Sequence, residues 1–263
     1  MMKAFKLEEW VSERSFRKQI EWIESIKPAF HPVSQEPLEL PDFIRDYLSR
    51  KNIQLYSHQQ ACIEAIRKSE SVIVTTSTAS GKTLGYMLPI LERLLAHPKE
   101  TCLLIYPLKA LANDQLKQIQ EMLETMNLKI PAFIYDGDTP QSQRSAIRSK
   151  ARIILTNPYE LHYILPWHLK WAHFYSQLHT VVIDEAHTYR GVFGSNFALL
   201  IRRLKRVCSY YHSKLTFVLS SATMQNAQEF SKKLVDETCV LIDKDGSEKG
   251  VKHFVFYNPF KDG

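Results

Sequence analysis

The segment Ser71–Thr83 constrains the fold more than any other part of this chain. It reads Ser-Val-Ile-Val-Thr-Thr-Ser-Thr-Ala-Ser-Gly-Lys-Thr. Its first half, Val72–Thr75, is β-branched and predicts a buried strand. Small residues follow, and a helical pattern starts at Leu84. We expect a phosphate cradle here, because loop N–H groups converge with the positive end of a helix dipole.

The loop offers particular groups to a nucleotide. Lys82 can reach the β- and γ-phosphates, and the hydroxyl of Thr83 can ligate Mg²⁺. Two positions depart from the usual pattern: Thr76 stands where the first glycine is common, and Ala79 replaces another. A chance Gly-Lys-Thr after a strand remains the alternative for this segment alone. The residues expected to bind the nucleotide phosphates are Thr78, Ala79, Ser80, Gly81, Lys82 and Thr83.

Composition narrows the class of protein. With 263 residues and 44% hydrophobic content, the chain can form one large domain or two small ones. The net charge of +6 fits a nucleic-acid partner, but a solvated basic face explains it equally well. Cys62, Cys102, Cys208 and Cys239 form no C-x-x-C pair, which favours buried thiols. No apolar run has membrane-spanning length, so we expect a monomeric cytoplasmic protein without a membrane partner.

The first part of the chain, residues 1–52, is predicted to be a helical extension. Apolar residues from Trp10 and Phe16 to Ile26 suggest an amphipathic helix that ends before Pro28. Asp42 is expected to cap a short helix that contains Phe43–Leu48. The sequence does not choose between packing on the main domain and contact with a partner.

Strands and helices alternate after this extension. Such alternation predicts an α/β fold with a mostly parallel sheet and helices on both faces. Ligands bind at the carboxyl ends of the strands in these sheets, so function should cluster there. We expect strands at 101–106, 132–135, 152–155, 181–184 and 216–220, and helices at 110–126, 195–209 and 226–235.

Two carboxylates follow the apolar segment Val181–Ile183. Asp184 is expected to hold Mg²⁺ through water, and Glu185 to orient or deprotonate an attacking water. His187 can bridge to neighbouring loops. Alone, this run would more often be an acidic turn after a core strand, but the upstream phosphate loop favours a catalytic role for Lys82, Asp184, Glu185 and His187.

Other strand ends carry groups that suit nucleic-acid phosphates. The residues concerned are Pro107, Lys109, Gly137, Asp138, Thr156 and Asn157. Each of these segments alone is explained equally by ordinary turn chemistry. Hydroxyls in Ser220–Thr223 can bond the Asp184–His187 loop and transmit the nucleotide state.

Together these motifs, in this order, resemble the first RecA-like lobe of superfamily-two helicases of the DEAH-box kind. The resemblance covers about Ile53–Val240 and implies the three-layer RecA-like fold, with ATP and Mg²⁺ as cofactors. It implies that Tyr56 and Gln59 belong to an adenine-reading element, and that Ser221 and Thr223 couple the sites.

The residues of these motifs are similar to those of one branch of DNA-repair helicases, which includes the bacterial mitomycin repair factor A and its RecQ-like fungal relatives. That likeness implies ATP-driven 3′-to-5′ movement on single-stranded or tailed DNA, in crosslink or adduct repair. It implies a second RecA-like lobe that supplies catalytic arginines, and a zinc-binding cysteine cluster in a C-terminal region. This chain contains neither, so we expect residues 53–250 to be the first lobe, residues 251–263 a linker, and the fragment inactive alone.

Three other functions remain open at this stage. The motifs contact nucleic-acid backbone, so an RNA remodeller of the DEAD/DEAH type is possible on sequence grounds. A non-enzymatic scaffold is disfavoured by the intact Lys82, Asp184 and Glu185. A small-molecule P-loop kinase would have no use for the several strand-end motifs.

Overall fold

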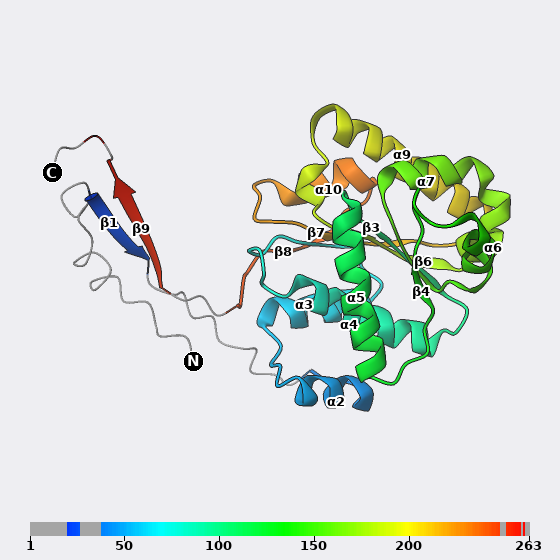
Figure 1. The fold of residues 1–263 in the computed structure, drawn as a ribbon, viewed down its shortest axis with the longest axis horizontal. Coiled ribbons are helices and arrows are strands. Elements are labelled where there is room, and N and C mark those ends of the chain that lie inside the picture. Colours follow the sequence, from blue (N-terminus) through cyan, green and yellow to red (C-terminus); the bar gives the residue numbers. More distant parts are fainter. Residues whose placement is uncertain (1–19, 27–37, 248–250, 259, 261–263) are drawn as a thin grey trace. The chain divides into compact units, whose positions relative to one another are not determined.

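The computed structural model describes residues 20–26, 38–247, 251–258 and 260 (Figure 1). The chain forms two compact units. One comprises residues 33–245, and the other comprises residues 1–32 together with 246–263.

The larger unit is built on a seven-stranded sheet in which every pairing is parallel. The strands follow the order β4-β5-β3-β6-β7-β2-β8, and the five most central are buried along their whole length except at His179 of β6. Burial on both sides explains why their sequences are mostly apolar without a regular alternation of polar residues. The strands are β2 (Val72–Val74), β3 (Thr101–Ile105), β4 (Ala132–Ile134), β5 (Ile153–Thr156), β6 (Leu178–Ile183), β7 (Thr216–Ser220) and β8 (Val240–Ile242).

Helices cover both faces of this sheet. Side chains alternate along each strand, so Leu104 and Val182 belong to one core while Leu103 and Val181 belong to the other. The first core is covered by α2 (Asp42–Arg50), α3 (Ser57–Arg67), α4 (Lys82–Ala96) and α5 (Lys109–Thr125). The second is covered by α6 (Gln141–Lys150), α7 (Pro158–Ile164), α8 (Ala172–Ser176), α9 (Gly191–Tyr210) and α10 (Ala227–Val235), with 3₁₀ turns η2 (Leu165–Trp171) and η3 (Ala186–Thr188). The predicted three-layer α/β fold is confirmed (Figure 1).

Helix α2 packs on the sheet unit, upstream of the boundary predicted at residue 53. Its buried side chains Ile44, Tyr47 and Leu48 are part of the core beneath α3 and α4. Asp42 is the first residue of the helix and Pro41 occupies the cap position, so the expected capping role of Asp42 is wrong by one residue. A carboxylate in the first turn still stabilises the helix through its dipole.

The described part of the smaller unit is a pair of antiparallel strands. β1 (Ile20–Ile26) pairs with β9 (Lys252–Tyr257), and the rings of Trp22 and Phe256 lie 5.0 Å apart. The helix predicted through Ile26 is therefore wrong over β1, because pairing with a distant strand outweighs a local pattern that also fits a helix. Trp10 and Phe16 lie outside the described residues. Strand β9 lies within residues 251–263, whose role as a linker stays a prediction.

Two further expectations can be compared with the structure. Cys62, Cys102, Cys208 and Cys239 are buried free thiols, as predicted. Within the described ranges, no helix is both long enough and apolar enough to cross a membrane.

We predict that Ile44→Ala lowers the free energy of unfolding of this chain by about 2–5 kcal/mol, because Ile44 is fully buried against the sheet unit. Urea denaturation followed by circular dichroism measures this change. Ile26→Ala is the matched control, since that isoleucine in β1 is 49% exposed and should cost much less. Equal, small effects of the two substitutions would show that α2 is not part of the folded lobe.

Candidate functional site

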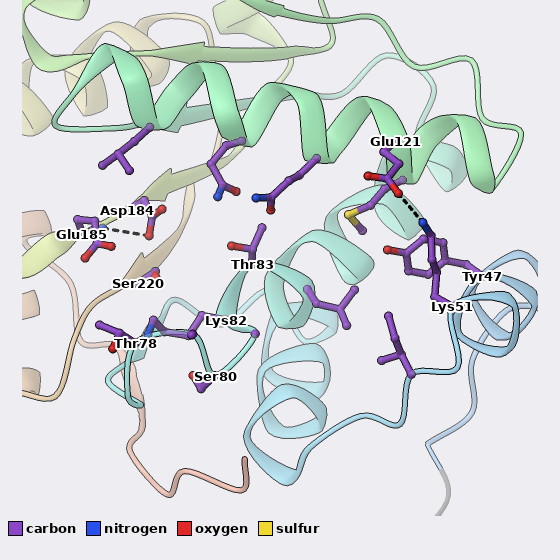
Figure 2. A pocket seen from close by; sticks show the side chains of 18 residues that line it. Tyr47, Lys51, Thr78, Ser80, Lys82, Thr83, Glu121, Asp184, Glu185 and Ser220 are labelled. Atoms are coloured by element: carbon purple, nitrogen blue, oxygen red, sulfur yellow. Dashed lines mark hydrogen bonds and ion pairs between the residues drawn. The ribbon is translucent and has the colours of Figure 1, made fainter. Parts of the chain in front are cut away.

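The phosphate loop, residues 76–83, is called the P-loop from here on. A cavity of about 510 Å³ opens where the P-loop and the carboxyl ends of β6 and β7 meet (Figure 2). Strand β7 separates the P-loop strand β2 from β6, so three strand ends contribute to one site. Figure 2 shows Thr78, Lys82, Asp184 and Glu185 at one end of the cavity, and Tyr47, Lys51 and Glu121 at the other. The full lining is Tyr47, Lys51, Ile53, Thr78, Ala79, Ser80, Gly81, Lys82, Thr83, Leu84, Leu111, Gln115, Gln118, Glu121, Met122, Asp184, Glu185 and Ser220.

The P-loop turns sharply between β2 and α4. Gly81 precedes the helix in the left-handed region, with φ of 76°, and Ala79 also has a positive φ of 61°. A Cβ on Gly81 would lie 2.5 Å from the side-chain nitrogen of Gln59, so glycine suits both the backbone angle and the position of that amide. Ala79 replaces a glycine that is common in related loops, and it adopts a left-handed conformation that glycine would adopt more easily.

Side chains close the loop on itself. The Thr76 and Ser80 hydroxyls lie 2.6 Å apart, so threonine at the usual glycine position braces the turn. The Lys82 ammonium donates to the carbonyls of Thr76 (3.0 Å) and Ser77 (2.7 Å). Burial lowers the pKa of Lys82, and the nearby carboxylates Glu185, Asp184 and Asp245 oppose that shift. A phosphate entering the loop can take over the hydrogen bonds of this ammonium from the two carbonyls.

The loop also rests on residues from α3 and from the end of the sheet unit. His58 Nε2 donates to the Ser80 carbonyl at 2.9 Å, and Asp245 accepts from the N–H of Ser77 at 3.1 Å. Gln59 is buried beneath the loop, where Nε2 donates to Gly81 O and Oε1 accepts from Tyr56 N, both at 2.9 Å. Neither Tyr56 nor Gln59 is part of the cavity lining, so the structure shows them supporting the loop, and their role in adenine reading stays a prediction.

The two acidic residues follow β6 as predicted. Burial raises the pKa of Asp184, while hydrogen bonds from Ser220 and from the Glu185 N–H act in the opposite direction. Glu185 itself has a φ of 48°, an uncommon backbone conformation that turns its side chain out of the strand. Oxygen groups of Thr83 and Asp184 line the same cavity and are the hard ligands that Mg²⁺ prefers.

The predicted coupling residues are placed differently from expectation. Ser221 is fully buried, with its hydroxyl on the Ala222 carbonyl, and Thr223 is exposed. Ser220 instead lines the cavity beside Asp184, and the N–H of Ala222 lies 3.4 Å from His187 Nδ1. That ring nitrogen also lies 3.3 Å from Glu185 Oε2. His187 therefore lies between its own loop and the loop that contains Ala222, as predicted. The structure thus places Ser220 and the Ala222 N–H beside the Asp184–His187 loop, and the coupling role of Ser221 and Thr223 stays a prediction.

Four of the predicted nucleic-acid residues lie just after two strands, at the same edge of the sheet. Pro107 and Lys109 follow β3, while Gly137 and Asp138 follow β4, and β5 lies between these strands. The Lys109 ammonium forms an exposed ion pair with Asp138 at 2.7 Å. The pair holds the two loops together across the sheet edge, and contact of these residues with nucleic acid stays a prediction.

Thr156 and Asn157 have internal roles. The Thr156 hydroxyl donates to the Tyr135 carbonyl at 2.7 Å, and its side chain is 1% exposed. Asn157 caps α7 by accepting from the N–H groups of Tyr159 and Glu160, both at 3.0 Å, which explains an asparagine before Pro158. Both residues are buried and hydrogen-bonded internally, and their contact with nucleic acid stays a prediction.

The far end of the cavity is formed by residues that no sequence motif indicated. Tyr47 and Ile53 line it opposite Met122, and an ion pair between Lys51 and Glu121 links the end of α2 to α5. An aromatic and apolar lining suits the flat face of a base. The apolar face of α2 was a visible signal, but only the packing of α2 beside α5 places it at the cavity.

The sequence of this chain matches the profile of a known protein family. The family profile described as DEAD/DEAH box helicase matches residues 56–230. This chain belongs to the DEAD/DEAH box helicase family. The match includes the P-loop and the two acidic residues that the cavity brings together.

Two helicases of known sequence are similar to this chain over most of its length. The chain is 40% identical over 260 residues to the uncharacterized ATP-dependent helicase YprA of Bacillus subtilis, covering 98% of this chain and 35% of YprA. It is 42% identical over 224 residues to the ATP-dependent helicase HRQ1 of Saccharomyces cerevisiae, covering 81% of this chain and 20% of HRQ1. The chain thus spans about a third or less of the length of these relatives.

Solved helicase structures have the same fold. The crystal structure of the DUF1998 helicase MrfA bound to DNA and AMPPNP matches with a TM-score of 0.91 and 40% identity, over 96% of this chain and 36% of that one. The DEAD-box helicase Mss116, at 20% identity and a TM-score of 0.68 over 78% of this chain and 43% of that one, shares the fold alone. The predicted RecA-like fold and the predicted branch of the helicase family are both confirmed.

We predict that Lys82→Ala weakens ATP binding to this helicase domain by about 1.5–3 kcal/mol, on the order of 10- to 100-fold, because a charge-assisted contact is lost. Isothermal titration calorimetry with ATP and Mg²⁺ measures the change. Lys232→Ala, an exposed lysine on α10, is the control and should bind as the parent does. Unchanged affinity of Lys82→Ala would remove the P-loop assignment.

Proposed function

We propose that this chain is the ATP-binding lobe of a DNA helicase or translocase that moves 3′ to 5′ and acts in repair of crosslinked or adducted DNA. One observation carries the proposal: Lys82, Thr83, Asp184 and Glu185 line a single cavity at the sheet edge. Loops suited to nucleic-acid phosphates end on the same edge. The similarity to MrfA, solved with DNA and AMPPNP, supports DNA and ATP as ligands.

In this proposal each group has a distinct task. The Lys82 ammonium binds the β- and γ-phosphates, and Thr83 and Asp184 would hold Mg²⁺, which neutralises phosphate charge when bound. Glu185 orients the attacking water and accepts its proton. His187 Nδ1 lies within reach of both the Glu185 carboxylate and the Ala222 N–H, so it can donate to the first or accept from the second and thereby respond to the state of the site.

The reaction also needs positive charge at the γ-phosphate. No arginine lines the cavity among the residues that the structure describes, and Arg190 lines a separate hollow with Phe230 of α10. We therefore propose that a second RecA-like lobe supplies the arginines, as the family resemblance implies. Such residues are worth about 10³–10⁵ in rate. The zinc site would lie outside this chain.

An RNA remodeller is the alternative function. Its support is the shared fold with Mss116, which was solved with single-stranded RNA but is only 20% identical. The identity of 40% to MrfA, solved with DNA, favours DNA.

The choice of polymer can be tested in a polypeptide that carries this chain and the second lobe. We predict that single-stranded DNA stimulates its steady-state ATPase activity well above RNA of equal length and base sequence. Glu185→Gln is the control for the assay, because loss of the base should reduce hydrolysis by about 10²–10⁴-fold while ATP binding persists. Stronger stimulation by RNA would replace the DNA proposal with the RNA remodeller.

We also predict the behaviour of residues 1–263 alone. The chain should bind ATP and hydrolyse it at least about 10³-fold more slowly than the two-lobed protein, because the arginine contribution is absent. Steady-state ATPase assays with single-stranded DNA measure this difference, with Arg190→Ala in parallel. Robust turnover that disappears in Arg190→Ala would show that one lobe carries its own catalytic arginine.

A further inference from the structure

The helices on one face of the sheet form a strongly basic layer. The segments 141–176 and 190–214, which contain α6 to α9, hold eleven arginines and lysines and a single acidic residue, Glu160. That gives these segments a net charge of +10, against +6 for the whole chain, so the rest of the chain is net negative. Glu160 is buried and paired with Arg144 at 3.2 Å. Such an asymmetric charge distribution is complementary to a polyanion.

A hollow of about 530 Å³ lies within this layer, between α7 and α9. Its lining combines aromatic rings with groups that can hydrogen-bond a base edge or a phosphate. Arg203 donates to His162 Nδ1 at 2.9 Å, which holds both side chains at the rim. The residues that define the hollow for this argument are Tyr159, His162, Phe193, Asn196 and Arg203.

Tyr159 is the exposed end of a stack of rings. Its ring lies 6.2 Å from that of Phe193, Phe193 lies 5.5 Å from Tyr189, and Tyr189 lies 3.9 Å from Phe197. Tyr189 and Phe197 are buried, whereas Tyr159 is 73% exposed. A large aromatic side chain supported on one side and exposed on the other presents a flat surface for another ring.

The backbone around this stack is tightly specified. Asn157 fixes the first turn of α7 by accepting from the N–H of Tyr159. Gly194 lets α9 approach Tyr189, because a Cβ at that position would lie 2.2 Å from the Tyr189 carbonyl. Tyr159 is thus held in place before any ligand arrives, which reduces the entropic cost of stacking.

We propose that Tyr159 and the hollow between α7 and α9 form a stacking site for an unpaired base of a single-stranded nucleic acid. The proposal rests on the proposed function and extends it from backbone contacts to a base contact. A second hollow, lined by Pro107, Leu108, Tyr159 and Glu185, makes the site continuous with the β3 loop and the nucleotide end of the lobe. Stacking on an aromatic ring is indifferent to base identity, as a translocating protein requires.

The test compares two labelled strands of equal length, oligothymidylate and a strand of abasic sugar-phosphate residues, by fluorescence anisotropy with this chain. The parent should bind oligothymidylate more tightly. Tyr159→Ala should weaken binding to oligothymidylate by about fivefold or more, the lower end for one base–aromatic stack, and leave the abasic strand unaffected. Tyr159→Phe keeps the ring and should bind as the parent does.

Tyr210→Ala is the matched control. Tyr210 is 66% exposed in the same basic layer, but it lies near the other end of α9, about 25 Å along the helix from Phe193. An equal loss for both strands in Tyr159→Ala, or an equal loss in Tyr210→Ala, would overturn the stacking site. If Tyr159→Ala binds oligothymidylate as tightly as the parent does, the stacking site is overturned and the proposed function stands. Failure of the parent to bind either strand would overturn the nucleic-acid part of the proposed function as well.

Discussion

The parallel hydrogen-bond ladder through β3, β6, β7 and β2 is the constraint on which the rest of this structure depends. Ile105 pairs with Ile183, Ile183 with Leu219, and Val74 with Ser220, so the strands end at nearly the same level. The middle of each strand is buried and apolar, so the polar side chains of the site follow its last apolar residue. The Asp184 N–H donates to Ile105 O at 3.0 Å and thereby continues the ladder by one residue. Asp184, Ser220 and the P-loop therefore meet at one edge.

This rigid edge supports loops that are locally unfavourable. Ala79 and Glu185 have positive φ angles, and Lys82 and Asp184 are partly removed from water. Surrounding contacts hold the strained loops in place, as is common at functional sites. Without a phosphate, the ammonium of Lys82 is satisfied by loop carbonyls, so the buried charge is never left without partners.

The two faces of the sheet serve different purposes. Helices α2 to α5 bury one face, and α2 and α5 with the P-loop enclose the nucleotide cavity. Helices α6 to α9 cover the other face and carry the concentrated positive charge. Tyr159 lines a hollow together with Glu185 and His187, so the aromatic stack on the basic face lies next to the catalytic loop.

Sequence alone determined the central sheet, the phosphate loop and the position of Asp184 and Glu185. These features depend on local apolar patterns and turn chemistry, which are written in consecutive residues. Tertiary structure decided which neighbouring hydroxyl faces the site, because the pleat and register direct Ser220 to the cavity and bury Ser221. It also turned Ile20–Ile26 into a strand through pairing with residues more than 200 positions away, and brought Asp245 to the P-loop. Contacts between distant segments have no local signature, so only the folded chain specifies them.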